Sequence, residues 1–380
     1  MKKVLFLLGT RPEVIKLAPV IFAAKKNPHL KTIVCATSQH RTMQDQMLEI
    51  FGIKPDYDLA VMKPNQDLFY LTAAILQAVQ TVLLQEKPDM VVVQGDTTTV
   101  MAGALAAFYA QIPVAHVEAG LRTHDLLAPF PEEANRQLAG RLTTLHFAPT
   151  HIAAENLKNE GIAASAIYVT GNTVIDALFW MLQHLDSKKV TATVPRAVVE
   201  IVQAQKPFIL VTGHRRESFG DDFEEICRAI KEIAVKHPDF HIIYPVHLNP
   251  NVQRPVFNIL AGIPNVQLIE PVTYDTFVWL LHACYLVLTD SGGVQEEAPS
   301  LGKPVLVMRQ VTERPEGIAA GTALLVGTDF NKIVGTVSEL IENKTSYEKF
   351  AHCENPYGNG TAAQQIIQVI ASFLSKNATA

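Results

Sequence analysis

Short apolar runs alternate with longer amphipathic stretches along most of the chain. The short runs are apolar throughout rather than at every second position, which is typical of parallel strands that helices cover on both faces. The stretches between them are long enough for the helices that must connect parallel strands. The pattern therefore predicts right-handed βαβ units assembled into doubly wound α/β sheets.

The expected strands form two series, one in each half of the chain. They are Val4–Leu8, Thr32–Ala36, Met90–Val93, Val114–Val117, Leu145–Phe147, Phe208–Val211, His241–Tyr244, Val266–Ile269, Leu286–Leu288 and Val305–Val307. The clearest connecting helices are expected at Leu68–Gln85, Thr97–Ala110, Phe223–Lys236 and Asp275–Cys284. A last helix, Thr361–Lys376, follows a stretch rich in Gly, Asn and Pro, and we expect it to pack back on the first half.

The strand series pauses between about residues 173 and 206, and we place the boundary between two domains there. The length of 380 residues also favours two domains, because a single core rarely grows past about 250–300 residues. We expect an N-terminal Rossmann-like domain over residues 1–172, completed by a C-terminal helix at about 361–380, and a second such domain over residues 173–360. Ligands of such sheets lie beyond the carboxyl ends of the strands, so we expect the ligand between the domains.

The composition does not change the predicted fold, but it argues against several classes of protein. Hydrophobic residues make up 48% and charged residues 18%, which is typical of a globular chain rather than a disordered one. The net charge of −5 argues against non-specific binding to nucleic acid, so any anion site must be built locally. The apolar start is too short for a signal peptide. No unbroken apolar run reaches about 18 residues, so we expect no membrane segment.

The four cysteines, Cys35, Cys227, Cys284 and Cys353, lie far apart in the sequence. None belongs to a CxxC pair, so neither a zinc site nor a redox pair is expected. We interpret them as reduced core or near-core thiols of a cytoplasmic protein.

Polar clusters follow two of the early strands. The segment Gly9–Glu13 offers a glycine turn, a proline suited to the first turn of a helix and, with Lys16, the cations of an anion site. The alternative is an ordinary βα turn with solvated charges, and the GxGxxG spacing of a dinucleotide fold is missing. In Gln94–Thr99, the carboxylate of Asp96 either faces the ligand or caps the next helix.

Two more acidic positions follow in the first half. Glu118 ends an apolar strand, where an unpaired carboxylate is costly, so it either serves a ligand or forms an ion pair with Arg122. Glu132 and Glu133 begin a helix after two prolines, and acidic residues there also favour the helix dipole. That structural interpretation suits Glu133 better than Glu132.

The second half carries a candidate phosphate site. Ser291–Gly293 follows an expected strand and opens a helix, which is typical of backbone N–H groups that cradle a phosphate. Glu297, about a turn later, could reach ribose hydroxyls. Ser-Gly-Gly alone is weak evidence, but His214, Arg215 and the downstream Arg314 strengthen the interpretation. Three carboxylates and a histidine at strand ends, with a phosphate cradle, indicate acid–base chemistry on a phosphorylated ligand. No metal-ligand spacing is present.

The ordered series GTRPE, QGDTTT, HVEAGLRT, PFPEEANR, GHRRES, PVHLNP, DSGGVQEEAP and ERPEG, from Gly9 to Gly317, resembles the non-hydrolysing UDP-N-acetylglucosamine 2-epimerases. The resemblance implies two Rossmann-like domains facing across a cleft, the GT-B-like architecture. It implies interconversion of UDP-GlcNAc and UDP-ManNAc, without a metal or nicotinamide cofactor, by elimination and re-addition of UDP through 2-acetamidoglucal. It also implies a homodimer and a product that feeds cell-envelope polysaccharides.

The resemblance assigns roles to individual residues. It gives Asp96, Glu118 and Glu132 the proton transfers and gives His214 the stabilisation of the departing diphosphate. The residues that match UDP-binding positions are Arg11, Lys16, Val272, Phe277, Ser291, Gly292, Gly293, Glu297 and Arg314. Some relatives bind a second UDP-GlcNAc as an activator, and the matching positions are Gln39, His40, Arg215 and His247.

Three other functions stay open. A hydrolysing epimerase would release free ManNAc and UDP; we expect no kinase-like domain from this sequence, which favours the non-hydrolysing form. A GT-B glycosyltransferase would need an acceptor and would not exchange the C2 proton of its donor. A non-catalytic nucleotide-sugar sensor would keep the phosphate cradle but could dispense with the three carboxylates, and their retention favours an enzyme.

Overall fold

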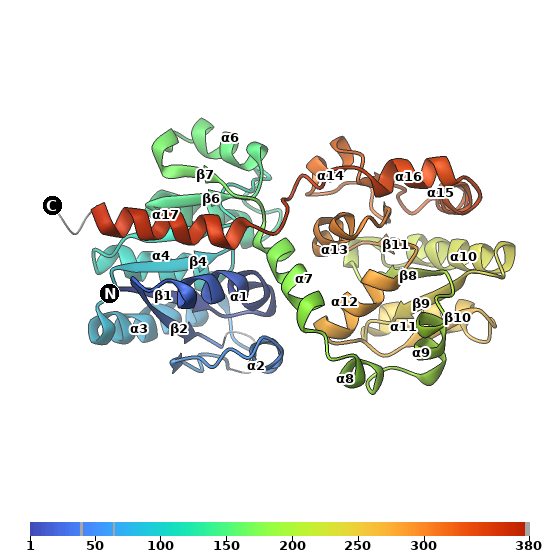
Figure 1. The fold of residues 1–380 in the computed structure, drawn as a ribbon, viewed down its shortest axis with the longest axis horizontal. Coiled ribbons are helices and arrows are strands. Elements are labelled where there is room, and N and C mark those ends of the chain that lie inside the picture. The colour runs from blue at the N-terminus through green and yellow to red at the C-terminus, as the bar shows by residue number, and fades with distance from the viewer. Residues whose placement is uncertain (39–40, 64, 377–380) are drawn as a thin grey trace. The chain divides into compact units, whose positions relative to one another are not determined.

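The computed structural model describes residues 1–38, 41–63 and 65–376, without the side chains of residues 41–43. Contacts divide the chain into two compact units (Figure 1), which we call unit 1 (Met1–Phe179 with Tyr357–Ala380) and unit 2 (Trp180–Pro356). The sequence analysis placed the first boundary at residue 172, earlier than this division. The difference arises because the first turns of helix α7 (Thr173–His184) bury Ile175 and Leu178 in unit 1.

Unit 1 contains a seven-stranded parallel sheet in the order β3-β2-β1-β4-β5-β6-β7. Its strands are β1 (Lys2–Leu8), β2 (Leu30–Ala36), β3 (Tyr57–Asp58), β4 (Met90–Gln94), β5 (Val114–Val117), β6 (Leu145–Ala148) and β7 (Ile167–Val169). Besides α7, its helices are α1 (Arg11–Lys26), α2 (Arg41–Ile50), α3 (Leu68–Glu86), α4 (Thr98–Tyr109), α5 (Glu132–Leu142), α6 (His151–Asn159), the short 3₁₀ helix η1 (Ala164–Ala166) and α17 (Ala362–Lys376).

Unit 2 contains a six-stranded parallel sheet in the order β10-β9-β8-β11-β12-β13. Its strands are β8 (Phe208–Thr212), β9 (His241–Pro245), β10 (Val266–Ile269), β11 (Leu286–Thr289), β12 (Val305–Val307) and β13 (Ala323–Leu325). Its helices are α8 (Ser187–Thr191), α9 (Arg196–Gln203), α10 (Asp221–Lys236), α11 (Pro250–Leu260), α12 (Tyr274–Ala283), α13 (Gly292–Glu297), α14 (Pro315–Ala319), α15 (Phe330–Glu342) and α16 (Lys344–Ala351), with 3₁₀ turns η2 (Arg216–Ser218) and η3 (Ala298–Leu301).

The predicted two-domain α/β fold is confirmed, and each predicted strand is present with small changes at its ends. The sequence analysis missed β3, β7 and β13, which are all edge strands of two or three residues. An edge strand is only partly covered, so β7 and β13 have half-buried positions where an interior strand is apolar throughout. The signal used to find the other strands is therefore absent from these three.

The order of strands reverses between β1 and β4 in unit 1, and between β8 and β11 in unit 2. At such a switch point the loops after the two strands diverge, which leaves a crevice at the carboxyl edge of the sheet where ligands bind. In unit 1 the two loops carry Gly9–Glu13 and Gln94–Thr99. In unit 2 they carry Gly213–Glu217 and the segment that begins at Asp290. The polar clusters found in the sequence thus flank the switch point of each sheet.

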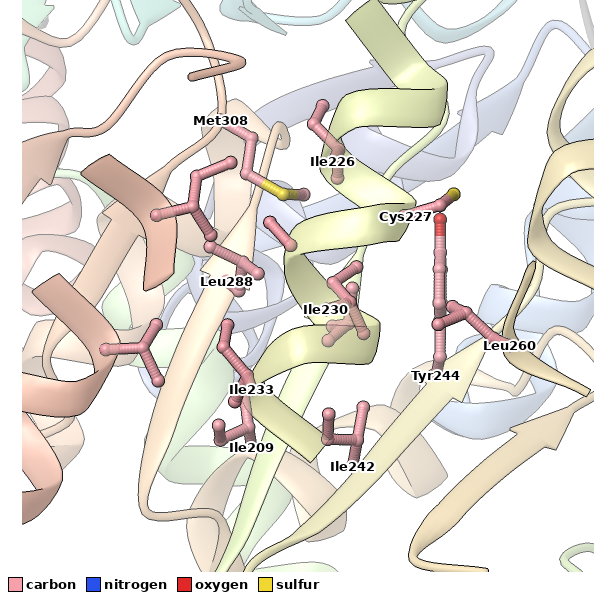
Figure 2. Packing of buried hydrophobic residues seen from close by; sticks show 14 of the residues in the cluster. Ile209, Ile226, Cys227, Ile230, Ile233, Ile242, Tyr244, Leu260, Leu288 and Met308 are labelled. Atoms are coloured by element: carbon pink, nitrogen blue, oxygen red, sulfur yellow. The ribbon is translucent and has the colours of Figure 1, made fainter. Parts of the chain in front are cut away.

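The core of unit 2 supports one of these loops directly. Helix α10 places Ile226, Ile230 and Ile233 on one face against the sheet (Figure 2), and burying each such side chain contributes about 1.5–3 kcal/mol. The fully buried Tyr244 on β9 belongs to the same cluster. Its hydroxyl donates a hydrogen bond of 3.0 Å to the carbonyl oxygen of Gly213, so the core fixes the first residue of the loop after β8.

Helix α17 belongs to unit 1 and packs alongside α1 (Figure 1). Its first turn is capped from α7, because the N–H of Ala363 donates a hydrogen bond of 2.9 Å to the carboxylate of Asp176. Burial raises the pKa of Asp176 to about 6, against the opposing effect of these backbone donors. The segment that returns from unit 2 is thereby fixed to the segment that leaves unit 1.

Helix α3 is long and apolar enough to cross a membrane by length and composition alone, although no unbroken apolar run in the sequence reaches about 18 residues. In the structure it packs on the sheet of unit 1 through Leu71, Ile75 and Val79. Only 28% of its most apolar stretch is buried, so much of its apolar surface is uncovered in this chain.

The stability of unit 1 should depend on pH through two buried histidines. His116 and His146 are neighbours on β5 and β6, and burial lowers the pKa of His116 to about 4 and that of His146 to about 3, from 6.5. Below pH 6.5 the unfolded chain binds protons that these two folded side chains exclude, so their contribution to stability is highest above pH 6.5 and falls toward pH 4. Each histidine should cost about 2 kcal/mol of unfolding free energy by pH 5.

His146→Phe should remove the part of this loss that is due to His146. The measurement is the change in the free energy of urea unfolding between pH 7.5 and pH 5. The exposed His151 on α6 offers the matched control His151→Phe, which should keep the wild-type dependence. Equal pH dependence in His146→Phe and wild type would contradict the assignment.

Candidate active site

The loop after β1 is organised by the buried carboxylate of Glu13. The N–H groups of Gly9 and Thr10 donate hydrogen bonds of 2.6 and 2.7 Å to one of its oxygens. The hydroxyl of Thr97, in the loop after β4, donates to the other at 2.5 Å. Burial raises the pKa of Glu13 to about 7, although these donors act in the opposite direction. Glu13 therefore joins the two loops that flank the switch point of unit 1.

Gly9 has a different role from the glycine turn that the sequence suggested. A Cβ at this position would collide with the hydroxyl oxygens of Thr37 and Thr99. Those two oxygens lie 2.9 Å apart in a hydrogen bond. Glycine is needed here because the backbone approaches this hydroxyl pair closely. Pro12 lies in the first turn of α1, as predicted.

Glu118 follows β5 with a left-handed backbone, at φ +63°, which is rare for a residue with a side chain. Its carboxylate is buried and is contacted by three side chains of the part of the chain that the structure describes. The ammonium of Lys16 lies 2.5 Å and the amide of Asn172 lies 3.1 Å from Oε1, while the amide of Gln94 donates to Oε2. The alternative partner Arg122 instead forms a two-point ion pair with Glu160, at 2.6 and 2.9 Å.

Asp96 is paired with Arg136 of α5. The Nε and Nη2 atoms of the guanidinium lie 3.0 and 2.8 Å from one oxygen of Asp96. The cap of α4, which the sequence offered as the alternative role of Asp96, is supplied by Thr97, whose side chain accepts from the N–H of Val100. Asp96 is therefore held by a charge rather than by the start of α4.

Glu133 completes this network as a structural residue. Its fully buried carboxylate accepts hydrogen bonds from the N–H groups of Thr123 and His124 and from Nη1 of Arg136. Burial alone would raise the pKa of Glu133, but the donors, with Gln137 foremost, outweigh it and lower the pKa. Glu132 is half-buried beside it, and we find no side-chain partner for it among the described residues. Glu133 therefore has a structural role, through loop N–H groups and Arg136, whereas a role for Glu132 in binding or catalysis stays a prediction.

A buried histidine missed by the sequence analysis supports the Asp96 loop. The imidazole of His116, on β5, lies with Nε2 at 2.7 Å from the carbonyl oxygen of Gly95. A carbonyl oxygen only accepts, so Nε2 carries the proton and donates. The lowered pKa of His116 keeps the ring neutral, which fixes this tautomer at neutral pH.

In unit 2, Asp290 joins the two loops at the switch point. One oxygen of its buried carboxylate accepts from the N–H groups of His214 and Arg215, at 2.6 and 2.7 Å. The other oxygen lies 3.5 Å from Nδ1 of His214. The His214 ring stacks on that of His247, with centroids 5.3 Å apart. The side chain of His214 is 43% exposed and is available to a ligand.

The predicted phosphate cradle opens α13. Ser291 is the residue before the helix, and its N–H donates a hydrogen bond of 3.0 Å to the hydroxyl of Thr289. A Cβ on Gly293 would meet none of the described atoms within 4 Å, and one on Gly292 would meet only the guanidinium of Arg215. Packing within the described chain therefore leaves open space over these two glycines, as a cradle requires.

The other predicted UDP-binding residues of unit 2 have partners of their own. The hydroxyl of Tyr274 donates a hydrogen bond of 2.6 Å to the buried carboxylate of Glu297. Arg314 lies 2.5 Å from an oxygen of Glu296. Val272 and Phe277 are partly buried residues that pack on one of the cores of the unit.

The positions predicted for an activator are only partly described. Gln39 and His40 lie outside the described residues. His247 accepts at Nδ1 from the N–H of Asn249, and burial, together with the charge of His214, lowers its pKa. Among the described residues there is no cluster of His, Cys, Asp and Glu that could hold a metal ion.

Two doubly wound sheets, with carboxylates at the switch point of one and an open glycine cradle at that of the other, define a two-domain α/β enzyme. A family model for UDP-N-acetylglucosamine 2-epimerase matches residues 23–371. The UDP-N-acetylglucosamine 2-epimerase of Escherichia coli K12 is 53% identical over 97% of this chain and 98% of its own length. The chain therefore belongs to the UDP-N-acetylglucosamine 2-epimerase family and is an enzyme of the isomerase class.

Solved structures of relatives agree. The UDP-GlcNAc 2-epimerase of Neisseria meningitidis, bound to UDP-GlcNAc, is 49% identical and superposes with a TM-score of 0.88, over 97% of this chain and all of that one. The Methanocaldococcus jannaschii enzyme, in complex with UDP-GlcNAc and UDP, is 37% identical with a TM-score of 0.77, over 98% of this chain and all of that one. The predicted family and the predicted GT-B-like fold class are thus confirmed.

The ion pair of Arg136 should contribute strongly to stability. Arg136→Met leaves the carboxylates of Asp96 and Glu133 without their shared cation, and removing one partner of a buried pair should cost about 3 kcal/mol of unfolding free energy. Urea unfolding at pH 7.5 measures this loss. The exposed Arg141 on the same helix provides the control Arg141→Met, which should cost less than about 0.5 kcal/mol. A loss no larger than the control's would overturn the assignment.

Proposed function

We propose that this chain interconverts UDP-GlcNAc and UDP-ManNAc by eliminating UDP and adding it back. A carboxylate takes the proton from C2, the bond from C1 to the diphosphate oxygen breaks with its electron pair on that oxygen, and 2-acetamidoglucal forms. In the return step the diphosphate oxygen adds to C1, and an acid delivers a proton to the opposite face of C2. The main support for this proposal is the set of carboxylates in unit 1, because proton transfer at carbon needs both a base and an acid.

In unit 1, the acid–base groups of the proposal are Asp96, Glu118 and Glu132. They differ in their surroundings, with Glu118 beside an ammonium, Asp96 beside a guanidinium and Glu132 without a described side-chain partner. Carboxylates in different surroundings can hold different protonation states at one pH, which is the condition for an acid and a base to work together.

Unit 2 supplies most of the groups that hold the nucleotide in this proposal. His214, the side chain of Ser291 and the N–H groups of Gly292 and Gly293 stabilise the charge on the departing diphosphate. The cations of Arg314 in unit 2 and of Arg11 and Lys16 in unit 1 add to this effect. The aromatic ring of Phe277, with backbone near Val272, takes the uracil, and Glu297 takes the ribose hydroxyls. The activator site stays a prediction, as do the cytoplasmic location and the link to cell-envelope polysaccharides.

The sharpest test is incubation with UDP-GlcNAc in deuterated water, followed by NMR or mass spectrometry of the nucleotide sugars. Deuterium should appear at C2 of both epimers, because the C2 proton leaves and is replaced. Asp96→Asn and Glu118→Gln should each lower the rate at least about 10²-fold. Folded variants of both with near-normal turnover would remove the acid–base assignment.

The same experiment separates the alternatives. A hydrolysing epimerase would accumulate free ManNAc and UDP, whereas a glycosyltransferase would leave the C2 proton in place. A sensor would bind UDP-GlcNAc without any exchange.

We also propose that two copies of the chain form a homodimer through unit 1. Leu84 of α3 is 66% exposed, Tyr109 at the end of α4 is 69% exposed and Leu138 of α5 is 55% exposed. Leu84 and Tyr109 line a groove of about 250 Å³ between α3 and α4. An apolar helix with so little of its apolar stretch buried is typical of a surface that a partner covers, and a second copy is the occupant that the family resemblance favours.

In a two-fold dimer the same surface of both copies forms the interface, so one substitution changes the interface twice. Leu84→Glu with Tyr109→Glu should therefore convert the dimer to a monomer, measured by sedimentation equilibrium. Val235→Glu, on the exposed face of α10 in unit 2, is the control and should leave a dimer. A wild-type monomer, or a dimer that survives the double substitution, would refute this interface.

A further inference from the structure

Asn172, which lies between β7 and α7, makes three kinds of contact at once. Its side-chain amide nitrogen lies 3.1 Å from Oε1 of Glu118. Its side-chain oxygen accepts from the N–H of Val174 at 3.1 Å, which caps the start of α7. Its backbone N–H donates a hydrogen bond of 2.7 Å to the carbonyl oxygen of Tyr357, where the chain has just returned from unit 2.

The two connecting segments touch closely at this point. A Cβ on Gly171, whose φ is +87°, would lie 3.1 Å from the carbonyl oxygen of Tyr357 and 3.2 Å from the Cα of Gly358. The φ of Gly358 is also positive, at +113°. Glycine at both positions allows the backbones to meet, and Tyr357 is buried. The position of Asn172 is therefore set by both connections between the units rather than by α7 alone.

Gln94, the last residue of β4, is the counterpart of Asn172 on the other oxygen of Glu118. It is buried, and its amide donates to Oε2. The two amides hold a carboxylate whose backbone is already in a sparsely populated conformation, so the direction of the carboxylate depends on its donors. Neither amide was selected by the sequence analysis.

We propose that Gln94 and Asn172 are positioning residues that hold Glu118 ionised and oriented for proton transfer at C2, and that Asn172 makes this hold depend on the segment at Tyr357. The inference rests on the proposed epimerase function. An amide N–H donates to the ionised carboxylate and favours it over the protonated form, which is the state a base requires.

The charged groups around Glu118 favour the same state. Lys16 of α1 contacts Oε1 directly, and its ammonium stabilises the carboxylate. His116, on β5, lies two residues before Glu118 and stays neutral at physiological pH because burial lowers its pKa to about 4. Arg122, on the other side in sequence, is neutralised by its ion pair with Glu160. Lys16 therefore supplies the positive charge beside Glu118, whereas the two amides set the direction of its carboxylate.

Asn172→Asp and Asn172→Ser distinguish the two roles of the Asn172 side chain, which caps α7 and donates a hydrogen bond to Glu118. Both replacements are good helix caps, so α7 keeps its start, but Asp places an oxygen against Glu118 and Ser is too short to reach it. Gln94→Glu tests the other oxygen in the same way. For each variant we expect kcat to fall at least about 10-fold with little change in KM.

The pH profile is the readout that a purely structural role would not move. The acidic limb of kcat/KM should shift upward by about one pH unit or more in Asn172→Asp and Gln94→Glu, because a neighbouring carboxylate disfavours ionisation of Glu118. A smaller upward shift is expected for Asn172→Ser. Asn265→Ser, which removes two hydrogen bonds to backbone carbonyls in unit 2, is the control and should lower Tm without moving the limb.

A measurement without substrate separates this proposal from the proposed function. Carboxyl ¹³C NMR of glutamate-labelled protein, with the Glu118 signal assigned by its loss in Glu118→Gln, follows its ionisation directly. Its midpoint should rise in all three variants, even if the wild-type enzyme fails to exchange deuterium and the epimerase proposal falls. Variants that keep the wild-type midpoint and acidic limb would overturn the positioning role, whatever the activity of the wild type. If one variant does not fold, the other two decide.

Discussion

A buried carboxylate at the switch point of each sheet holds together the two loops on which the candidate site depends. In unit 1 it is Glu13, which accepts from the loop after β1 and from Thr97 in the loop after β4. In unit 2 it is Asp290, which follows β11 and accepts from His214 and Arg215 after β8. Loops that diverge from neighbouring strands leave N–H groups without partners, and one acceptor between them satisfies several at once. Each crevice is therefore held open and rigid by the same device.

On this frame the candidate acid–base groups take different partners. Glu118 lies beside Lys16, and Asp96 lies beside Arg136, so each carboxylate is held in place by a cationic partner. Placing such groups on rigid loop ends reduces the reorganisation needed during reaction, which is the main source of electrostatic catalysis. Glu132 is half-buried, and no side-chain partner for it is found among the described residues.

The sequence predicted the fold well because interior parallel strands carry a strong local signal. It also located Asp96, Glu118 and His214 correctly at strand ends, since the end of a buried strand is visible from the apolar run before it. Partners were harder to predict, because they depend on distant parts of the chain. Arg122, four positions after Glu118, suggested an ion pair, but spacing of four implies proximity only within a helix, and this segment is a left-handed turn. Asn172 and Arg136 are brought to their carboxylates only by the folded sheet.

Unit 1 is made of two separate stretches of the chain, and this has a consequence for biosynthesis. Unit 2 is continuous and precedes α17 in the chain, so all of it leaves the ribosome before α17, which packs on α1, has emerged. The amino-terminal unit therefore emerges first but is completed last. Until then the surface of α1 that α17 covers stays open in the nascent polypeptide, where it is a candidate contact for a chaperone.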